Sequence, residues 1–307
     1  MGWFDRWRRA RQVETARAEL FDETFQRRLE YLQVAARRLF AGRLRAERKT
    51  RKAGSGLEFA AHREYTAGDD LRALDWNVYA RSERLLLKQF EEEEDLTIAV
   101  LVDCSGSMLH GPAKFDHARR LAAALAYVGL ANLDRVALYG VNTRVLKRLP
   151  PARGKGQIFK VFDFLRGLEC GGETALADAG RSFGAEQKRR GVAIVVSDLY
   201  DPQGFERGIN ALRYQKFEPL VVHVIDPDDR ALDEEGDLVL VDVEDGHARE
   251  VTLTEAMRRR FGEVHAAWCA EVEAFCKARQ IAYAPARVDQ PFEDQVLTLF
   301  RRMGLVG

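Results

Sequence analysis

The sequence has few cysteines and no long apolar run. Its four cysteines, in 307 residues, form no Cys-x-x-Cys pair, so we expect neither a disulfide framework nor a cysteine-rich zinc site. The apolar run 96–102 is far shorter than the roughly 18 residues that a membrane-spanning helix needs. Together with the lack of an apolar leader at the N-terminus, these absences predict a cytoplasmic protein without a membrane span.

An excess of charge of either sign is also absent, because 48 basic and 48 acidic residues cancel. Such a chain has no global field that favours nucleic acid or an anionic membrane, and neither is expected as a partner. Three aromatic residues, Trp3, Phe4 and Trp7, stand among arginines near the N-terminus. Two interpretations remain open for them: a frayed terminus, or contact with a membrane surface or a partner.

The pattern of apolar and charged residues divides the chain into three segments. Residues 1–56 are predicted to hold one or two amphipathic helices between Ala16 and Leu44, followed by a basic linker. Residues 57–95 predict a small β extension, with a strand, a short helix and a second strand. Residues 96–307 alternate apolar runs with amphipathic helices, which is typical of a doubly wound, mainly parallel α/β sheet covered on both faces.

Two details of the α/β segment matter for its topology. A strand over 136–141 is expected to lead directly to a helix over 157–168. Alternating runs on either side of Asp245-Gly246 predict a hairpin insertion near 237–252, because Asp-Gly is a strong short-range hairpin signal.

Oxygen-bearing side chains gather in three predicted loops of this segment, 103–108, 171–176 and 197–201. In open parallel sheets, ligands bind outside the carboxyl ends of the strands, so we expect these loops to converge. Five side chains supply the donors: Asp103, Ser105, Ser107, Thr174 and Asp198. Carboxylates and hydroxyls suit Mg²⁺ (or Mn²⁺), and the lack of His or Cys argues against zinc. Waters would complete the shell and leave one position for an acidic group of a partner.

Each donor also has an ordinary structural explanation. Thr174 alone is more often a helix N-cap, and Asp198 alone could simply end a strand. The Asp-x-Ser-x-Ser pattern over 103–107 is more specific, because a turn does not otherwise need three oxygen donors at alternate positions. Asp201 is an alternative donor in the last loop.

The three loops resemble the metal-ion-dependent adhesion site of von Willebrand factor A domains. In that site an Asp-x-Ser-x-Ser loop, a Thr in a second loop and an Asp in a third hold a metal. The resemblance implies that the five donors named above bind the metal, directly or through water. It also implies that the protein is a protein-binding module and not an enzyme.

A second resemblance covers the segment where the pattern alone is least informative. The string Gly56–Asn77, GLEFAAHREYTAGDDLRALDWN, and its continuation through 80–81 and 87–91 resemble the bacterial domain of unknown function 58. Members look like adaptors that work beside MoxR-type AAA+ ATPases in assembling client complexes. The resemblance implies that the partner offering an acidic residue is such an ATPase or its client. Many members carry membrane segments, and this chain differs from them in that respect.

The same segment is dense in charges of both signs, with Trp76 among them. A structural hypothesis assigns these charges to helix caps and ion pairs that fix the segment against the main domain, with Trp76 as an apolar anchor. The alternative is a docking surface for a partner. The charged residues concerned are Arg63, Asp69, Asp70, Arg72, Asp75, Arg81 and Lys88.

Two competing functions stay open beside the binding module. One is a Mg²⁺-dependent hydrolase or phosphotransferase that uses Asp103 as nucleophile. Against it, Ser105 is a poor proton donor, nothing in the sequence places Lys114 near a phosphate, and no P-loop motif is present. The other is a purely structural scaffold, in which the metal only closes the loops.

Overall fold

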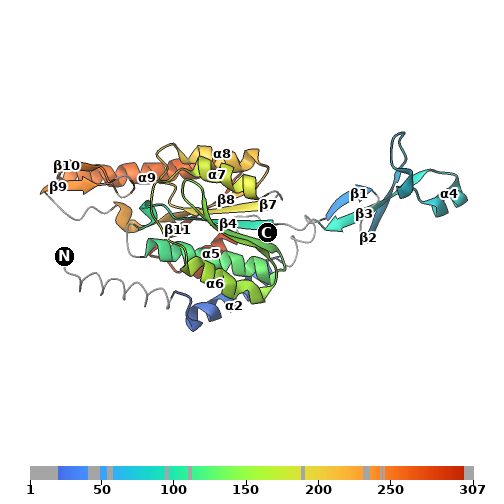
Figure 1. Cartoon of the computed structure of the whole chain (residues 1–307), viewed down its shortest axis with the longest axis horizontal. Helices are drawn as coiled ribbons and strands as arrows, with labels where there is room; N and C mark the ends of the chain where they lie inside the picture. Colours follow the sequence, from blue (N-terminus) through green and yellow to red (C-terminus); the bar gives the residue numbers. More distant parts are fainter. Residues whose placement is uncertain are drawn as a thin grey trace. The chain divides into compact units, whose positions relative to one another are not determined.

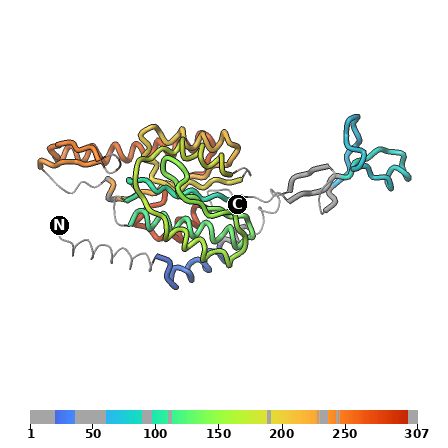
Figure 2. The backbone as a smooth tube through the Cα atoms, viewed as in Figure 1, coloured from blue at the N-terminus to red at the C-terminus, as the bar shows by residue number. Residues whose placement is uncertain are grey.

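The computed structural model describes residues 20–40, 49–53, 58–93, 97–109, 113–187, 191–230, 236–242, 244 and 246–300, and Figure 2 traces the backbone. The chain forms two compact units: residues 40–96 make one, and residues 1–39 with 97–307 make the other. Trp3, Phe4, Trp7 and Asp245 lie outside the described residues. Among the described helices, none combines the length and the apolar character that crossing a bilayer requires.

The larger unit is built on a six-stranded sheet with the order β11-β8-β7-β4-β5-β6. Five strands are parallel, and β6 runs antiparallel to β5 at one edge. The bounds are β4 Thr97–Asp103, β5 Arg135–Val141, β6 Val145–Ala152, β7 Gly191–Ser197, β8 Glu218–Ile225 and β11 Ala282–Arg287. This arrangement confirms the prediction of an α/β unit with a mainly parallel central sheet.

Helices cover both faces of this sheet (Figure 1). One face carries α7 Leu176–Glu186, α8 Phe205–Tyr214 and α9 Glu255–Ala278; the other carries α5 Lys114–Ala131, α6 Ile158–Arg166 and α10 Phe292–Phe300. The predicted N-terminal helix is present as α2 Glu23–Phe40, and it forms a further layer outside α6 and α10. There Phe21, just before α2, stacks on Phe162 at 4.6 Å between ring centroids, and Phe25 lies 5.0 Å from Phe292.

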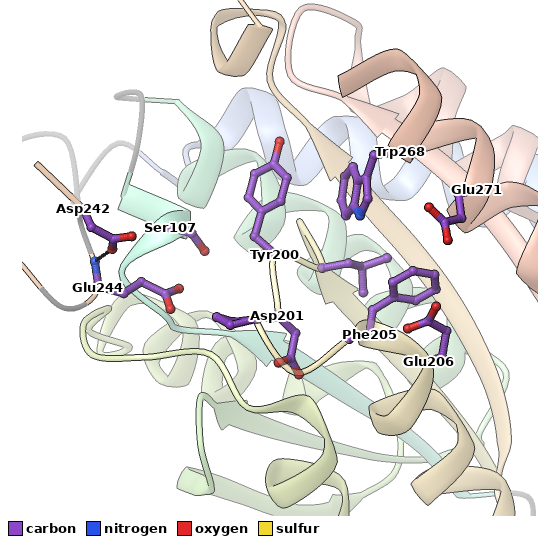
Figure 3. A pocket seen from close by; sticks show the side chains of 12 residues that line it. Ser107, Tyr200, Asp201, Phe205, Glu206, Asp242, Glu244, Trp268 and Glu271 are labelled. Carbon is purple, nitrogen blue, oxygen red and sulfur yellow. Dashed lines mark hydrogen bonds between the residues drawn. The ribbon is translucent and has the colours of Figure 1, made fainter. Parts of the chain in front are cut away.

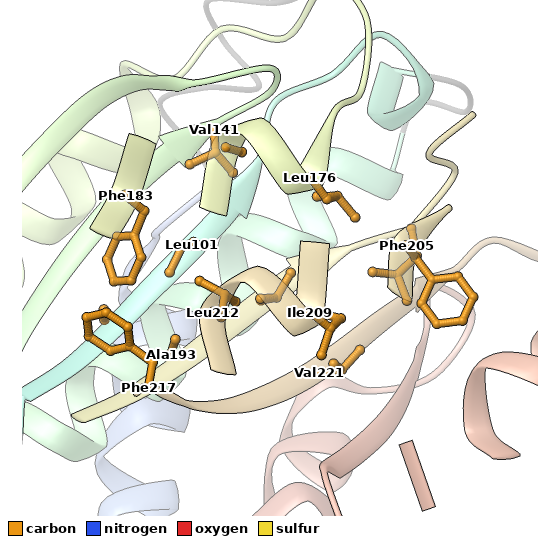
Figure 4. Packing of buried hydrophobic residues seen from close by; sticks show 14 of the residues in the cluster. Leu101, Val141, Leu176, Phe183, Ala193, Phe205, Ile209, Leu212, Phe217 and Val221 are labelled. Carbon is orange, nitrogen blue, oxygen red and sulfur yellow. The ribbon is translucent and has the colours of Figure 1, made fainter. Parts of the chain in front are cut away.

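The packing of the core explains why the strands appear in the sequence as apolar runs. In β4, Ala99 and Leu101 point to the same face as Ala137 and Tyr139 of β5, where they join a cluster with side chains of α7, α8 and α9 (Figure 4). The intervening residues Val100 and Val102 are buried as well. A central parallel strand is covered on both faces, so it has no polar side that would reveal a period of two.

Strand β6 was missed by the sequence analysis, which placed no strand between 141 and the next helix. Its sequence, VLKRLPPA, is mostly exposed and contains two prolines. Proline lacks the amide hydrogen that a central strand donates, so it is tolerated at sheet edges, where apolar periodicity is weak. The structure places β6 at such an edge.

The predicted hairpin insertion is confirmed, as β9 Gly236–Val241 pairs antiparallel with β10 Ala248–Leu253. These two strands form a sheet of their own, separate from the six-stranded sheet. Helix α9 follows at once, and its N-cap Thr254 accepts a hydrogen bond from the amide of Met257 at 3.3 Å.

The smaller unit is a three-stranded antiparallel sheet in the order β1-β3-β2. Its strands are β1 Lys49–Ala53, β2 Glu58–Glu64 and β3 Leu86–Glu93, and between β2 and β3 lie the 3₁₀ turn η1 Leu71–Ala73 and α4 Trp76–Ser82. The prediction of a basic linker is therefore wrong over 49–53, which pairs with β3. The run of like charges suggests an open chain, but the backbone register places Lys49 opposite Glu93 and Arg51 opposite Glu91.

Candidate functional site

The candidate site lies where β4 and β7 end, at the carboxyl edge of the sheet. Asp103 is the last residue of β4 and Ser197 is the last residue of β7, its parallel neighbour. Strand β4 is the topological switch point of the sheet, because the chain continues to β5 on one side and returns to β7 on the other. All five predicted donor side chains are buried, with at most 7% exposure: Asp103, Ser105, Ser107, Thr174 and Asp198.

The first loop is organised around the Asp103 carboxylate. One oxygen, Oδ1, accepts a hydrogen bond from the amide of Ser105 at 2.9 Å. The other, Oδ2, accepts one from the hydroxyl of Ser197 at 2.5 Å. The hydroxyls of Ser105 and Ser107 lie 3.0 Å apart. The loop therefore turns its oxygen atoms inward, toward one another.

The last loop adds Asp198 to this group. The Ser107 hydroxyl donates to Asp198 Oδ1 at 3.3 Å, which connects two residues 91 positions apart in the sequence. Asp201 has a different role, because its carboxylate accepts hydrogen bonds from the amides of Leu176 and Gln203, each at 2.8 Å. It thus holds the start of α7, and the geometry favours Asp198 as the donor of this loop.

The second loop is clamped onto the first by backbone hydrogen bonds. The amide of Gly106 donates to Gly172 O, and the amide of Gly171 donates to Cys104 O, each at 2.9 Å. Gly172 has φ +79°, a conformation that glycine adopts without strain. Thr174 comes next in the chain. The structure records no hydrogen bond between Thr174 and the other four predicted donors. Its hydroxyl and its amide both donate to the carboxylate of Glu244, at 2.6 and 3.0 Å.

Lys114 is a site residue that sequence reasoning did not place. Its side chain is fully buried, and Nζ lies 2.7 Å from Asp198 Oδ2 and 2.8 Å from Asp229 Oδ2. It also donates to Ser107 O at 3.3 Å. Burial alone disfavours its charge, but the two carboxylates outweigh burial and raise the pKa of Lys114. No local sequence signal marks it, because its partners come from distant loops.

The electrostatics of the site fit an additional cation. Burial, and then the nearby charge of Asp198, raise the pKa of Asp103 to about 7. The connected side chains include the carboxylates of Asp103, Asp198 and Asp229 but a single ammonium group, that of Lys114. A divalent ion bound by Asp103 and the serine hydroxyls would offset the remaining negative charge.

Clusters rich in acidic, His or Cys side chains offer no competing site. Within the described ranges, no group of three or more His, Cys, Asp or Glu side chains could hold a metal ion. The candidate site differs from such clusters because three of its five donors are hydroxyls. Oxygen donors of this kind suit Mg²⁺ or Mn²⁺ and not a thiophilic metal.

A pocket of about 530 Å³ opens beside Ser107 (Figure 3). Tyr200, Phe205 and Trp268 form aromatic parts of its wall. Its acidic lining residues are Asp201, Glu206, Asp242, Glu244 and Glu271. The pocket leads from Ser107 to the surface, and its walls carry negative charge.

Residues 61–270 match the family model described as "Protein of unknown function DUF58". The chain belongs to this family. Its similarity to uncharacterized mycobacterial proteins extends over most of both chains. It is 29% identical over 262 residues to the proteins Mb1516 of Mycobacterium bovis and Rv1480 of Mycobacterium tuberculosis, covering 83% of this chain and 82% of theirs.

Two solved structures are similar to this DUF58 protein at low identity. One is described as the conserved hypothetical protein BatB from Bacteroides thetaiotaomicron, with 16% identity and a TM-score of 0.40. The other is described as an aerotolerance-related membrane protein from Bacteroides fragilis, with 18% identity and a TM-score of 0.42. Each match covers 68% of this chain and 98% of the other chain.

The smaller unit of this DUF58 protein holds the charged signature. Caps and ion pairs within this unit are confirmed for five of its charged residues, Arg63, Asp69, Asp70, Asp75 and Lys88. Asp75 caps α4 through the amides of Asn77 and Val78, and its carboxylate also lies 2.9 Å from His62 Nε2. Hydrogen bonding from His62, above all, lowers the pKa of Asp75. Lys88 approaches the same carboxylate at 3.6 Å.

A second carboxylate of this unit is held in the same way. Arg63 pairs with Asp69 at 2.7 Å, and the amide of Thr66 donates to the other oxygen of Asp69 at 2.8 Å. The hydrogen bond from Arg63 is the main reason that the pKa of Asp69 is lowered. Asp70 caps η1 by accepting from the amide of Arg72 at 2.9 Å.

Within the smaller unit, Trp76 does not act as an apolar anchor. Its side chain is 60% exposed and lies in an edge-to-face arrangement with the half-exposed Tyr79, with 6.1 Å between ring centroids. The reason is its position: Trp76 opens α4 directly after the cap Asp75, and this short helix buries none of its own residues.

Proposed function

We propose that this DUF58 protein is a metal-dependent protein-binding adaptor, whose larger unit is a von Willebrand factor A-like domain. The observation that carries the proposal is the connected set Asp103, Ser105, Ser107 and Asp198 at the carboxyl end of the switch-point strand. Its buried carboxylates exceed the positive charge beside them. Such a set supports a metal-ion-dependent adhesion site with Mg²⁺ or Mn²⁺ as the bound ion.

In this proposal, Asp103, Ser105, Ser107, Thr174 and Asp198 hold the ion, directly or through water. The ion supplies a Lewis-acidic position that an acidic side chain of a partner protein can occupy. Lys114 fixes Asp198 and neutralises part of the buried charge, so the loops keep their geometry. The partner is an AAA+ ATPase of the MoxR type or its client, in a cytoplasmic assembly or maturation step, as the resemblance to adaptors suggests.

The test is a calorimetric titration of metal-stripped full-length protein with Mg²⁺ and Mn²⁺. We expect binding by the unchanged chain and none by Asp103→Ala, because that change removes the carboxylate that carries the excess charge. Asp163→Ala is the matched control, since its side chain is 75% exposed on α6. If the unchanged chain takes up neither ion, the proposal fails.

The partner is tested by affinity capture from the native host, with and without a chelator. An ATPase subunit or client that is retained in Mg²⁺ and lost with the chelator or with Asp103→Ala supports the adaptor role. A purely structural scaffold predicts a different outcome: Asp103→Ala lowers the melting temperature and leaves capture unchanged.

The phosphotransferase alternative is less well supported by the geometry. An ammonium group has three N–H donors, and those of Lys114 meet Asp198, Asp229 and Ser107 O. None is left for a phosphate oxygen. An assay with generic phosphate esters checks this alternative, and turnover that disappears with Asp103→Ala would favour it.

A further inference from the structure

The residue that meets Thr174 comes from the tip of the β9–β10 hairpin. Glu244 lies 70 positions from Thr174, yet its two carboxylate oxygens accept the hydroxyl and the amide of that residue at 2.6 and 3.0 Å. Thr174 is buried and Glu244 is half-buried. A carboxylate of this chain therefore reaches one of the five proposed metal-binding residues from the pocket side.

The tip of the hairpin is itself built to present Glu244. The amide of Glu244 donates to Asp242 Oδ1 at 2.8 Å, and the amide of Asp242 donates to His247 O at 2.8 Å. The amide of Gly246 closes the turn on Asp242 O at 3.0 Å. Figure 3 shows the Glu244 carboxylate pointing into the pocket, on the same side as Ser107.

The Glu244 carboxylate shares its pocket with several other acidic side chains. Asp201, Glu206, Asp242 and Glu271 line the same pocket, and Asp103 and Asp198 lie buried behind Ser107. The two hydrogen bonds from Thr174 hold the Glu244 carboxylate in this acidic setting. A divalent ion bound beside Thr174 would attract the same carboxylate.

The hairpin is held loosely enough to be displaced. Strands β9 and β10 pair with each other and not with the main sheet. Of their residues, Leu253 is buried and most of the others are exposed. A two-stranded hairpin with little buried apolar surface opens at a low free-energy cost.

We propose that Glu244 is an internal occupant of the adhesion site, and that the β9–β10 hairpin is an autoinhibitory cover over it. This inference rests on the proposed function. Glu244 takes the place that the proposed site offers to an external acidic side chain, so a partner must displace the hairpin before it can bind. The partner segment therefore offers a carboxylate that competes with Glu244.

The experiment uses full-length protein loaded with Mn²⁺, which relaxes the protons of the water bound to it. Glu244→Ala is expected to open a coordination position, so the bound ion gains about one exchangeable water and the water-proton relaxation rate rises. Acetate, as a generic carboxylate, should then lower the rate again in the variant, and far less in the unchanged chain. Glu250→Ala is the matched control, since Glu250 is exposed on β10 of the same hairpin.

Hydrogen exchange supplies a second readout, which does not depend on the ion. In Glu244→Ala the amides of 236–253 should exchange about tenfold faster, because the charged hydrogen bonds that hold the tip are gone. Glu244→Gln should show a smaller change in the same direction, since one amide oxygen can still accept from Thr174. Thermal melting confirms that both variants are folded.

The outcomes separate this inference from the proposed function. Suppose that the unchanged chain binds Mn²⁺ and Asp103→Ala does not. If Glu244→Ala then gives the same water-proton relaxation rate and the same hydrogen-exchange rates as Glu250→Ala, the internal occupant is refuted and the metal site is not. If the unchanged chain binds no Mn²⁺, both ideas fall. A rise in relaxation that is confined to the Glu244 variants, together with faster exchange of the hairpin, supports the inference.

Discussion

The two units of this DUF58 protein use their carboxylates in opposite ways. In the smaller unit, Asp69 and Asp75 cap turns and pair with Arg63, His62 and Lys88, and their pKa values are lowered. In the larger unit, Asp103 is buried beside Asp198 and its pKa is raised to about 7. The first pattern stabilises a fold, whereas the second weakens it unless a cation binds.

The size of the apolar core accounts for this difference. The smaller unit has a core of Ala73, Leu74 and Leu87, with Tyr65 packed against it. The larger unit buries apolar side chains from four strands and three helices in one continuous cluster. A large core can compensate for unfavourable buried charge, so a functional site can be placed at its edge. A small unit needs its ion pairs for its own structure.

The largest expected effect comes from the core of the larger unit. Phe183 is fully buried against Tyr139 and Phe217, with 4.9 and 4.8 Å between ring centroids. Phe183→Ala should lower the free energy of unfolding by about 3–5 kcal/mol, through lost apolar contact and the cavity left behind. Urea unfolding measures this loss. Phe159→Ala, on the 60% exposed Phe159 of α6, is the control, and equal losses in both would contradict the account.

The next effect concerns the charged network of the smaller unit. Asp75→Ala removes the cap of α4 and leaves His62 and Lys88 without that carboxylate. We expect faster hydrogen exchange throughout 58–93 and unchanged exchange in 97–300, because the small core cannot hold the unit alone. Glu83→Gln, at an exposed position of the same unit, should leave both regions as they were. Exchange that also rises across the large sheet would show that the units do not respond independently.

When no metal is bound, acidification should change the stability of the two units in opposite directions. For Asp103, the pKa of the folded chain lies above the ordinary 3.8, so the folded state binds the proton more tightly. The larger unit therefore gains stability as the pH falls from about 7 toward 4. We expect a gain on the order of 1–3 kcal/mol, because one pKa unit corresponds to about 1.36 kcal/mol and relaxation of the buried site reduces the full amount. For Asp69 and Asp75 the shift is downward from 3.8, so the smaller unit loses stability below that pH.

Unfolding of the smaller unit between about pH 4.5 and pH 2.5 measures its loss of stability. Melting curves of chelated protein between pH 8 and pH 4.5 measure the gain of the larger unit. Asp103→Asn should remove the gain in the larger unit, since the amide has no proton to bind in this range. Saturating Mg²⁺ should reverse the trend, because protons then compete with the ion for Asp103. A larger unit that melts at the same temperature across this range would disprove the assignment.

The smallest effect is expected at Trp76. Because its side chain is 60% exposed, Trp76→Ala should change the free energy of unfolding by less than about 0.5 kcal/mol. Chemical denaturation followed by circular dichroism gives the value. A loss as large as that of Phe183→Ala would mean that Trp76 is an anchor after all.

The sequence predicts the parts of this protein that depend on neighbouring residues. The continuous apolar run of β4 indicates a central parallel strand, and Asp-x-Ser-x-Ser over 103–107 marks the loop that follows it. Both signals are local, since backbone turns and strand burial act within a few residues. The hairpin over 236–253 was predictable for the same reason.

The remaining parts of the site depend on contacts between distant segments. Lys114 meets Asp229 across 115 positions, and Ser107 meets Asp198 across 91. Glu244 stands in the hairpin turn that Asp245-Gly246 predicts, but that motif says nothing of its contact, which appears only when Thr174 is placed beside it. Trp76 shows the converse, because residue type alone predicted burial that the position on α4 does not provide.

The edge strand β6 has a consequence for association between copies of the chain. An open sheet edge invites pairing with a strand of another molecule, which leads to aggregation. The outer strand here carries Lys147 and Arg148 together with Pro150 and Pro151. Charge repels a second copy, and the prolines cannot donate to it. This edge therefore disfavours strand pairing between two copies of the chain.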